Sequence, residues 1–573
     1  MNRCAVWAPH ATRVEVEMRG MRVPLRATTG DWFELQPGAL EPGDDYAFVL
    51  DGGAPRPDPR SPWQPHGVGG ASRAVDHDAF AWTDAAWRGR QLSDCVVYEL
   101  HTGTFSAAGT FDGAIEHIEQ LVKLGVGIIE LLPVAAFPGE RGWGYDGVDL
   151  YAVHDAYGGP DALKRFVDAC HGAGLAVVVD VVYNHLGPDG NHLADFGPYF
   201  TDRHRTPWGD AINYDGAGSD EVRGFFVDNA LMWLRDYHCD GLRLDAVHAM
   251  VDTSAVHLLE EIATAVHALS GRLGRPLWVI AESDLNDPRV VNDVERGGHG
   301  CDAQWSDDFH HALHATLTGE KGGYYSDFGR VKDVALALRC VFVNPGGYSP
   351  FRRRRHGRAV GALASTRFLG YMQNHDQVGN RSQGERSAAL MTTGRLQIAA
   401  ALVLLGPFVP MLFAGEEWAA STPFQYFTDH QDRELGRLVS EGRRREFASF
   451  GWDPATVPDP QDRDTFEHSR LQWPEREREP HATVLRWHTE LIALRASLPA
   501  LRDGDRRAVA VEYDETDRWL VMRRSGVSVA CNWGGTTVDL PMAVATVVLS
   551  NVDVVQSATG VLVPPDGVVV ARA

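Results

Sequence analysis

The segment Asp240-Gly-Leu-Arg-Leu-Asp-Ala-Val-His248 has the form of a short buried strand that ends in a carboxylate. Because side chains alternate along a strand, Leu242 and Leu244 can point one way while Arg243 and Asp245 point the other. A cation beside a carboxylate favours the ionised form, so Asp245 is a candidate nucleophile. Taken alone, the motif fits a structural ion pair better, and its interpretation therefore depends on the rest of the chain.

Short apolar segments alternate with helical segments from about residue 91 onward, which is typical of a parallel sheet. The predicted strands are 96–100, 127–132, 175–182, 241–245, 277–281, 303–305, 368–372 and 410–414. Eight such strands predict an α/β fold, a closed (β/α)₈ TIM barrel. After the third strand we expect an irregular polar insertion at about 184–220, and a loop of that length is more often functional than idle.

The flanking regions have a different pattern. Residues 1–90 contain short alternating runs separated by Gly, Pro and Asp, which predict an N-terminal β-sandwich. The barrel is predicted to span 91–484, and residues 485–573 to form a helix and a C-terminal β-sandwich. The run 396–415 is long and apolar enough for a membrane span, but Gly406, Pro407 and Pro410 interrupt it. We interpret it as a buried helix and a buried strand, and expect no membrane partner.

Composition narrows the class of protein. A chain of 573 residues exceeds the size of one domain, and its formal charge of -23 argues against a nucleic-acid partner. The seven cysteines are odd in number and too widely spaced for a zinc motif, a usage typical of a reducing compartment. The first residues lack the apolar run of a signal peptide. We therefore expect a cytoplasmic protein with a neutral ligand.

Acidic residues follow several of the predicted strands, and the carboxyl ends of barrel strands share one rim. The carboxylates at these ends are those of Asp180, Asp245, Glu282 and Asp376. Crowded carboxylates cannot all stay ionised, so their pKa values should separate. Glu282 follows an apolar run and has no basic neighbour in sequence, which favours a raised pKa and a role as general acid. One attacking carboxylate and one proton donor are what glycoside hydrolysis requires.

Four segments resemble, in order and spacing, the four short signature regions of the α-amylase superfamily of retaining glycosidases. These are 180–185, 240–248, the Glu282 segment and 374–376. Val6-Trp-Ala-Pro-His-Ala-Thr-Arg-Val-Glu-Val16 is similar to the carbohydrate-binding β-sandwich module that precedes the barrel in branching and debranching enzymes. Within the superfamily the chain is most similar to the trehalose-releasing branch. That similarity covers nearly the whole chain, is weakest in the C-terminal sandwich, and rests on the motifs Arg141-Gly-Trp-Gly-Tyr-Asp146, Tyr183-Asn-His-Leu-Gly-Pro188, Ala281-Glu-Ser-Asp-Leu-Asn-Asp-Pro-Arg289, Asn374-His-Asp-Gln-Val-Gly-Asn380 and Ser421-Thr-Pro-Phe-Gln-Tyr-Phe-Thr-Asp-His430.

The resemblance implies roles for individual residues. Asp245 would be the nucleophile, Glu282 the general acid and base, and Asp376 the transition-state stabiliser. The residues expected to bind the sugar whose linkage is broken are Tyr145, Asp180, His185, Arg243 and His375. The residues expected on the trehalose side are His248, Glu417, Phe424 and Asp429, although a loop that merely packs on the barrel is an equally open interpretation.

The implied substrates are maltooligosyltrehalose and malto-oligosaccharides, and the implied reaction is hydrolysis of the α-1,4 bond that joins the maltooligosyl part to a terminal trehalose. No carboxylate cage for calcium stands out, so we expect neither a required metal nor a cofactor. A branching enzyme that transfers the glycosyl group, or another glucan hydrolase of the superfamily, shares the same chemistry, and free trehalose as the product would separate the trehalose-releasing enzyme from both. A non-catalytic carbohydrate-binding barrel is the other alternative, and unchanged activity in Asp245→Ala would favour it.

Overall fold

Eight parallel strands close into a barrel in the order β9-β10-β13-β16-β17-β18-β21-β22 in the computed structural model, which describes residues 4–449, 453, 456–542 and 546–572. The strands are β9 Val97–Leu100, β10 Ile128–Leu131, β13 Ala176–Val181, β16 Gly241–Leu244, β17 Trp278–Ala281, β18 Ala303–Trp305, β21 Phe368–Gly370 and β22 Val409–Phe413. The predicted (β/α)₈ barrel is confirmed.

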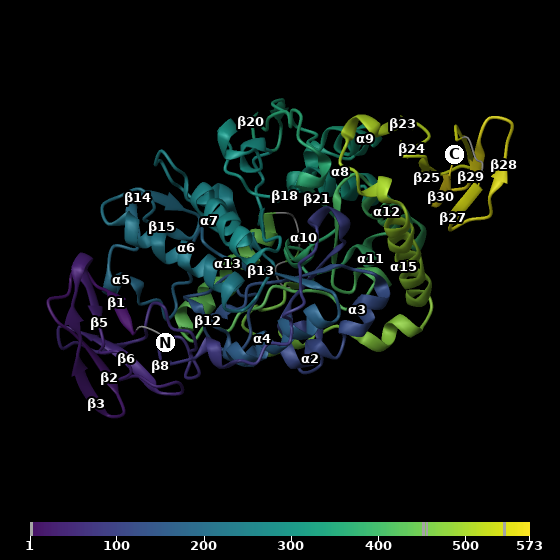
Figure 1. Cartoon of the computed structure of the whole chain (residues 1–573). Helices are drawn as coiled ribbons and strands as arrows, with labels where there is room; N and C mark the ends of the chain where they lie inside the picture. Colours follow the sequence, from purple (N-terminus) through teal and green to yellow (C-terminus); the bar gives the residue numbers. More distant parts are fainter. Residues whose placement is uncertain (1–3, 450–452, 454–455, 543–545, 573) are drawn as a thin grey trace.

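Helices surround this barrel, and Figure 1 shows them packed around the strands in the middle of the molecule. The longer ones are α3 Ile118–Leu124, α4 Gly159–Gly172, α6 Ser219–Arg235, α7 Leu258–Leu273, α8 Asp307–Thr318, α9 Val331–Cys340, α12 Thr393–Leu404, α13 Arg433–Ser449 and α15 His481–Ser497. The apolar run 396–415 forms most of α12 and all of β22, as predicted. Within the described residues, no helix combines the length and apolarity needed to cross a bilayer.

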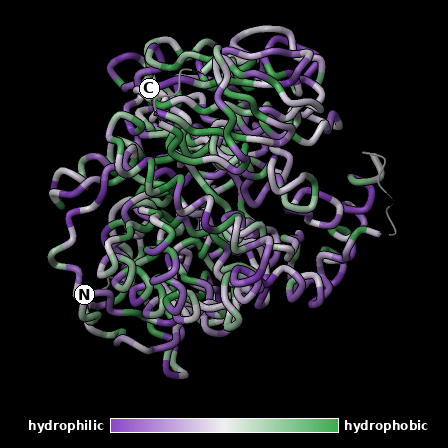
Figure 2. The backbone as a smooth tube through the Cα atoms, turned by 90° about the vertical axis from the view of Figure 1, so that its right-hand side faces the viewer, coloured by the Kyte–Doolittle hydropathy of each residue, from purple (hydrophilic) through white to green (hydrophobic). Residues whose placement is uncertain are grey.

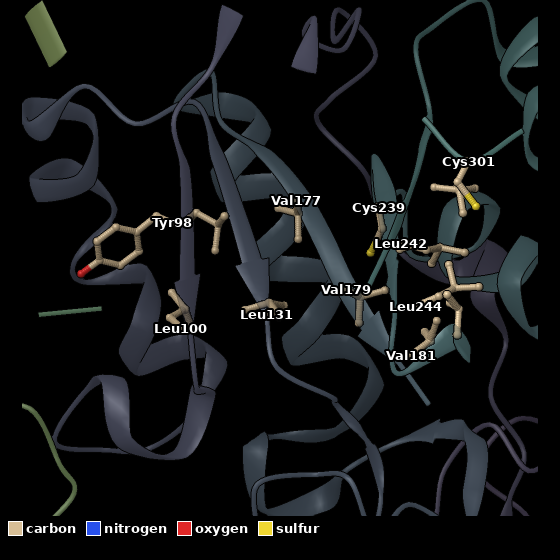
Figure 3. Close-up of a cluster of buried hydrophobic side chains, with 14 of the residues drawn as sticks. Tyr98, Leu100, Leu131, Val177, Val179, Val181, Cys239, Leu242, Leu244 and Cys301 are labelled. Atoms are coloured by element: carbon tan, nitrogen blue, oxygen red, sulfur yellow. The ribbon is translucent and has the colours of Figure 1, made fainter. Parts of the chain in front are cut away.

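The barrel strands bury both faces, which is why they are almost continuously apolar in sequence. Leu242 and Leu244 pack outward in one cluster with Val179 and Val181 (Figure 3). A second cluster fills the barrel interior and includes Val97, Ile128, Val178, Ile280 and Met411. Figure 2 shows the same arrangement along the whole chain, with hydrophobic segments concentrated inside.

Two small sheets precede the barrel and lie at its left side in Figure 1. One contains β1 Ala5–Trp7, β5 Trp32–Glu34 and β4 Arg26–Ala27, and the other contains β3 Met21–Pro24, β2 Val14–Met18, β6 Asp45–Leu50, β7 Pro55–Arg56 and β8 Ser72–Arg73. This is the two-sheet arrangement expected for residues 1–90.

Two further sheets follow α15 at the other end of the molecule. They contain β23 Ala510–Asp514, β24 Trp519–Arg524, β25 Val527–Asn532, β30 Gly567–Arg572 and β27 Thr546–Ser550, and β26 Val538–Leu540, β29 Val561–Val563 and β28 Val555–Gln556. The alternating sequence at 544–549 predicts a strand, and its first two residues, 544 and 545, lie outside the described residues. The division at residues 90 and 484 stays a prediction.

The insertion after β13 differs from its prediction as an irregular loop. It contains the short helix α5 Leu193–Phe196 and an antiparallel hairpin of β14 Phe200–Thr206 and β15 Gly209–Ile212. The sequence prediction was wrong here because β14 is polar and half-exposed along both faces, so it lacks the alternation that marks a strand packed on a core.

Candidate active site

Barrel register places the predicted acids at one rim. Asp180 on β13 lies directly opposite Arg243 on β16, Asp245 is the first residue after β16, and Glu282 is the first after β17. All are therefore at the carboxyl ends of neighbouring strands, where the side chains of a barrel of this class form its active site.

One buried guanidinium connects three of these acids. Arg243 is fully buried, and its Nη1 donates to Asp180 Oδ2 at 2.6 Å and to Asp245 Oδ1 at 2.9 Å. Its Nη2 lies 2.8 Å from Glu282 Oε2, an ion pair whose angle is poor for a hydrogen bond. The guanidinium also stacks over the Trp305 ring, 4.3 Å from its centroid. Asp245 and Glu282, far apart in the chain, thus meet at one cation.

The candidate nucleophile is held by a second contact. Asn184 Nδ2 donates to Asp245 Oδ2 at 2.6 Å and to the Asp245 carbonyl at 2.8 Å. The next residue, Ala246, has a φ of 39°, and this turn directs its N–H to Glu282 Oε2 at 2.8 Å. Both carboxylates are therefore fixed by the same short segment, so their relative position varies little.

Burial raises the pKa of Glu282, and the negative charge of Asp245 raises it further, while Arg243 opposes both effects. A raised pKa is the change expected for a carboxyl group that acts as proton donor. The sequence argument was incomplete, however, because it gave Glu282 no basic neighbour, whereas Arg243 contacts it across the strand boundary. Glu282 is thus a buried acid beside a cation, with both protonation states accessible to catalysis.

Tyr145 joins the group from the loop after β10. Its hydroxyl donates to Asp180 Oδ2 at 2.6 Å and lies 2.8 Å from His375 Nε2, and its ring stacks on that imidazole. Gly144 makes this possible, because it has a φ of 99° and a Cβ there would lie 2.4 Å from the Pro133 carbonyl oxygen. Burial raises the pKa of Asp180 to about 7, against the opposing effect of Arg243.

Asp376 is the most exposed of the three predicted catalytic acids, with 39% of its side chain accessible. Its Oδ1 lies 3.6 Å from His375 Nε2 and accepts a hydrogen bond from Asn380 Nδ2 at 3.3 Å. A hollow of about 290 Å³ is lined by Gln377 and Asn380, which follow Asp376 in the chain, together with Arg381, Tyr324 and Tyr325. The hollow therefore lies next to the segment that carries the exposed acid.

His185 contacts the hairpin of the insertion after β13. Its ring stacks on Trp208 at the tip of the β14–β15 hairpin, with centroids 4.3 Å apart, and Trp208 is 50% exposed. Burial lowers the pKa of His185 to about 4, so its ring is neutral, and Nδ1 donates to Asn184 Oδ1 at 2.5 Å. His185 thus supports Asn184, which in turn holds Asp245.

The four residues expected on the trehalose side do not form one group. His248 is partly exposed in the turn Val247–Ala249 (η5), with Nε2 3.9 Å from Asp284 Oδ1. Asp429 is mostly buried, accepts from the Glu140 N–H and pairs with Arg141 at 3.0 Å, so it anchors the loop before Tyr145.

Glu417 and Phe424 are only 2% and 1% exposed, which favours the alternative interpretation, a loop that packs on the barrel. Glu417 accepts from the Tyr98 hydroxyl at 2.8 Å, and Phe424 packs against Trp143 and Phe413. Neither segment has a periodicity that shows which side chains face the cleft and which face the core. We therefore leave these two residues out of the candidate site.

Sequence reasoning also missed residues that the structure brings into the site. Trp305 stacks on Arg243, and Glu99 on β9 contacts His375. Glu99 carried a usable signal, because an acid in the otherwise apolar Val97-Tyr-Glu-Leu100 strand needs a buried partner. Trp305 had no such signal in the sequence, since a tryptophan at a strand end is an ordinary core residue.

Comparisons with known proteins agree with this geometry. The family model "Alpha amylase, catalytic domain" matches residues 78–199. A malto-oligosyltrehalose trehalohydrolase of Arthrobacter ramosus is 53% identical over 90% of this chain and 89% of its own length. The enzyme of that name from Mycobacterium tuberculosis is 49% identical over 94% and 93%.

Among solved structures, a crystal structure assigned to an alpha amylase of Salmonella typhimurium superposes with a TM-score of 0.91 at 38% identity, and the match covers 100% of this chain and 97% of the other. The identity to curated relatives extends over nine-tenths of both chains, well beyond the catalytic barrel. The chain therefore belongs to the malto-oligosyltrehalose trehalohydrolase family of the α-amylase superfamily.

Proposed function

We propose that this protein hydrolyses the α-1,4 bond between the maltooligosyl part and the terminal trehalose of maltooligosyltrehalose, and so releases trehalose. The observation that carries the proposal is the meeting of Asp245 and Glu282 at Arg243, on the carboxyl rim of a barrel that belongs to this family. A carboxylate pair of this kind performs retaining glycoside hydrolysis.

The proposed reaction has two steps. Glu282 gives its proton to the O4 of the trehalose unit while Asp245 attacks C1 of the attached glucosyl residue, which forms a covalent glycosyl enzyme and frees trehalose. Glu282, now ionised, takes a proton from water, which displaces Asp245 and restores the anomeric configuration. In this mechanism the two carboxyl groups lie about 5 to 5.5 Å apart.

We assign sugar binding at the cleaved linkage to the connected group around Arg243. Its members are Tyr145, Asp180, His185, Arg243 and His375, with Asp376 stabilising the positive charge that develops at C1. The partly exposed ring and hydroxyl of Tyr145 suit an uncharged sugar, which is recognised by stacking and by hydrogen bonds. His248 remains our candidate for the trehalose side, because it follows the nucleophile and lies beside Asp284, two residues after the acid.

We also propose a cytoplasmic location. All seven cysteines are free, and six of them are buried, with Cys340 the exposed one. Buried thiols without disulfides are the usage of a reducing compartment.

A product assay tests the proposed function. The purified protein is incubated with maltotriosyltrehalose, and the products are separated by anion-exchange chromatography, with amylose and maltopentaose as parallel substrates. We expect free trehalose and maltotriose in equal amounts, and neither in the Asp245→Asn variant, whose melting temperature is measured as the control for folding. New α-1,6 branches in amylose would instead identify a branching enzyme, and glucose or maltose as the main products would reject the trehalose assignment.

A further inference from the structure

A buried glutamate beneath the active site has no role in the mechanism above. Glu99 on β9 is 1% exposed, and both of its carboxylate oxygens accept from one residue. Oε1 lies 2.5 Å from His375 Nδ1, and Oε2 accepts the backbone N–H of His375 at 3.0 Å. An acceptor at Nδ1 requires a proton on that nitrogen, so Glu99 fixes half of the protonation state of the ring.

The other ring nitrogen faces the reaction centre. His375 Nε2 lies 2.8 Å from the Tyr145 hydroxyl oxygen and 3.6 Å from Asp376 Oδ1. When Asp180 is ionised, the Tyr145 hydroxyl gives its own proton to Asp180, so the Tyr145 oxygen accepts from His375. Both ring nitrogens therefore carry protons in this network, and the ring is an imidazolium.

We propose that Glu99 is a positioning residue that keeps His375 doubly protonated and directs its Nε2–H at Tyr145 and Asp376. The inference rests on the proposed function for its catalytic consequence. A fixed cation beneath Asp376 orients that acid and keeps the Tyr145–Asp180–Arg243 chain of hydrogen bonds in one direction. Without the negative charge of Glu99, the His375 ring can lose a proton. The hydrogen bonds between His375, Tyr145 and Asp180 can then run in the opposite direction.

The other titratable groups around the ring are consistent with this assignment. The groups that face His375 from neighbouring elements are Glu99 on β9, His101 after β9, Glu130 on β10, Tyr145 after β10, Arg243 on β16 and Asp376 on α10 His375–Gly379. Burial lowers the pKa of His375, but Glu99 and Asp376 outweigh burial and the repulsion of Arg243, and they raise it to about 9.

The matched variants are Glu99→Gln and Glu130→Gln. Glu130 is the register partner of Glu99 on the adjacent strand and is equally buried. Burial raises the pKa of Glu130 well above its ordinary value, so its carboxyl is already neutral and glutamine replaces it without a change of charge. Glu99→Gln removes a negative charge at nearly the same depth in the barrel.

Activity is the first readout. We expect Glu99→Gln to lower kcat by about 10- to 100-fold with a smaller change in KM, and to move the alkaline limb of kcat/KM to lower pH. Glu130→Gln should leave both unchanged. Because Glu99 acts through His375, Glu99→Gln should have little further effect in a His375→Gln background.

The second readout needs no turnover, so it separates this inference from the proposed function. The folded pKa of His375 is about 9 and the ordinary value is 6.5, so its stabilisation is complete below about pH 6.5 and is lost as the pH rises through about 9. The urea midpoint of the wild type should therefore fall over this interval relative to His375→Gln, a comparison that remains available if Glu99→Gln does not fold.

Three results would overturn the inference. These are a Glu99→Gln variant with wild-type kcat and pH profile, equal losses in Glu130→Gln, and a wild-type urea midpoint that follows His375→Gln across the whole pH interval.

Discussion

Replacing Glu282 by glutamine removes proton donation and leaves the other contacts of the site in place. The glutamine oxygen can keep the hydrogen bond that Glu282 Oε2 accepts from the Ala246 N–H at 2.8 Å, and Arg243 retains Asp180 and Asp245 as partners. The change therefore removes a proton and a charge with little effect on shape. Since burial disfavours the charge of Glu282, we expect its loss to leave the melting temperature nearly unchanged.

The expected effect is on the chemical step. A positioned general acid contributes about 10²- to 10⁴-fold, which is about 2.7 to 5.5 kcal/mol of transition-state stabilisation. The structure points toward the upper part of this range for Glu282, because the glycosidic oxygen of trehalose is a poor leaving group and neither Arg243 nor Asp245 can supply a proton to it. We expect kcat for trehalose release to fall by about 10³-fold or more.

The assay uses two substrates that differ in their leaving group. Maltotriosyltrehalose needs protonation, whereas α-maltotriosyl fluoride does not, so Glu282→Gln should still react once with the fluoride. The second step needs Glu282 as base, so the glycosyl enzyme should accumulate. Mass spectrometry of a proteolytic digest should then find the added maltotriosyl group on the peptide that contains Asp245.

Three observations would refute this reasoning. They are wild-type turnover of maltotriosyltrehalose by Glu282→Gln, loss of activity to the same extent with both substrates, and a covalent adduct on a peptide without Asp245. Asp376→Asn serves as the control, since it should slow both substrates because it acts on charge at C1 and not on the leaving group.

The remaining predictions concern the residues around the pair. Arg243→Lys replaces a planar group that contacts several acids by a single ammonium, so we expect kcat/KM to fall about 100-fold and the urea midpoint to show a loss of about 3 kcal/mol or more. Tyr145→Phe removes a donor to Asp180, and steady-state kinetics should show a 10- to 100-fold loss in kcat/KM, or about 1 to 3 kcal/mol. Gly144→Ala places a Cβ at positive φ against a carbonyl, and thermal unfolding should show a loss of about 1 to 3 kcal/mol. Because burial raises the pKa of Glu282, the proton donor persists above the ordinary range for glutamate, and kcat/KM should decline only as the pH rises through that raised value.

The strands of the barrel could be predicted well from sequence because each is buried on both faces. The alternation of Leu242 and Leu244 with Arg243 and Asp245 was also correct, and it follows from strand geometry alone. The β14–β15 hairpin was not predicted, since β14 is polar and partly exposed along its length and so has no apolar face to reveal it.

The chemical connections were less accessible than the elements. Glu99 and His375 are 276 residues apart, and no local pattern indicates that they share a proton. The sequence indicated that Arg243 pairs with Asp245, but closure of the barrel also brings Glu282 into contact with Arg243. For Phe424 two interpretations were open, because the sequence cannot show which side of a loop packs inward, and its burial favours the packing one.

The hairpin that carries Trp208 forms a sheet of its own, apart from the barrel strands that hold the acids. The acids and the exposed Trp208 ring are thus built from separate pieces of chain that meet at His185. Because His185 contacts Asn184, and Asn184 holds Asp245, a change in the ribbon at residues 200–212 would be transmitted to the nucleophile.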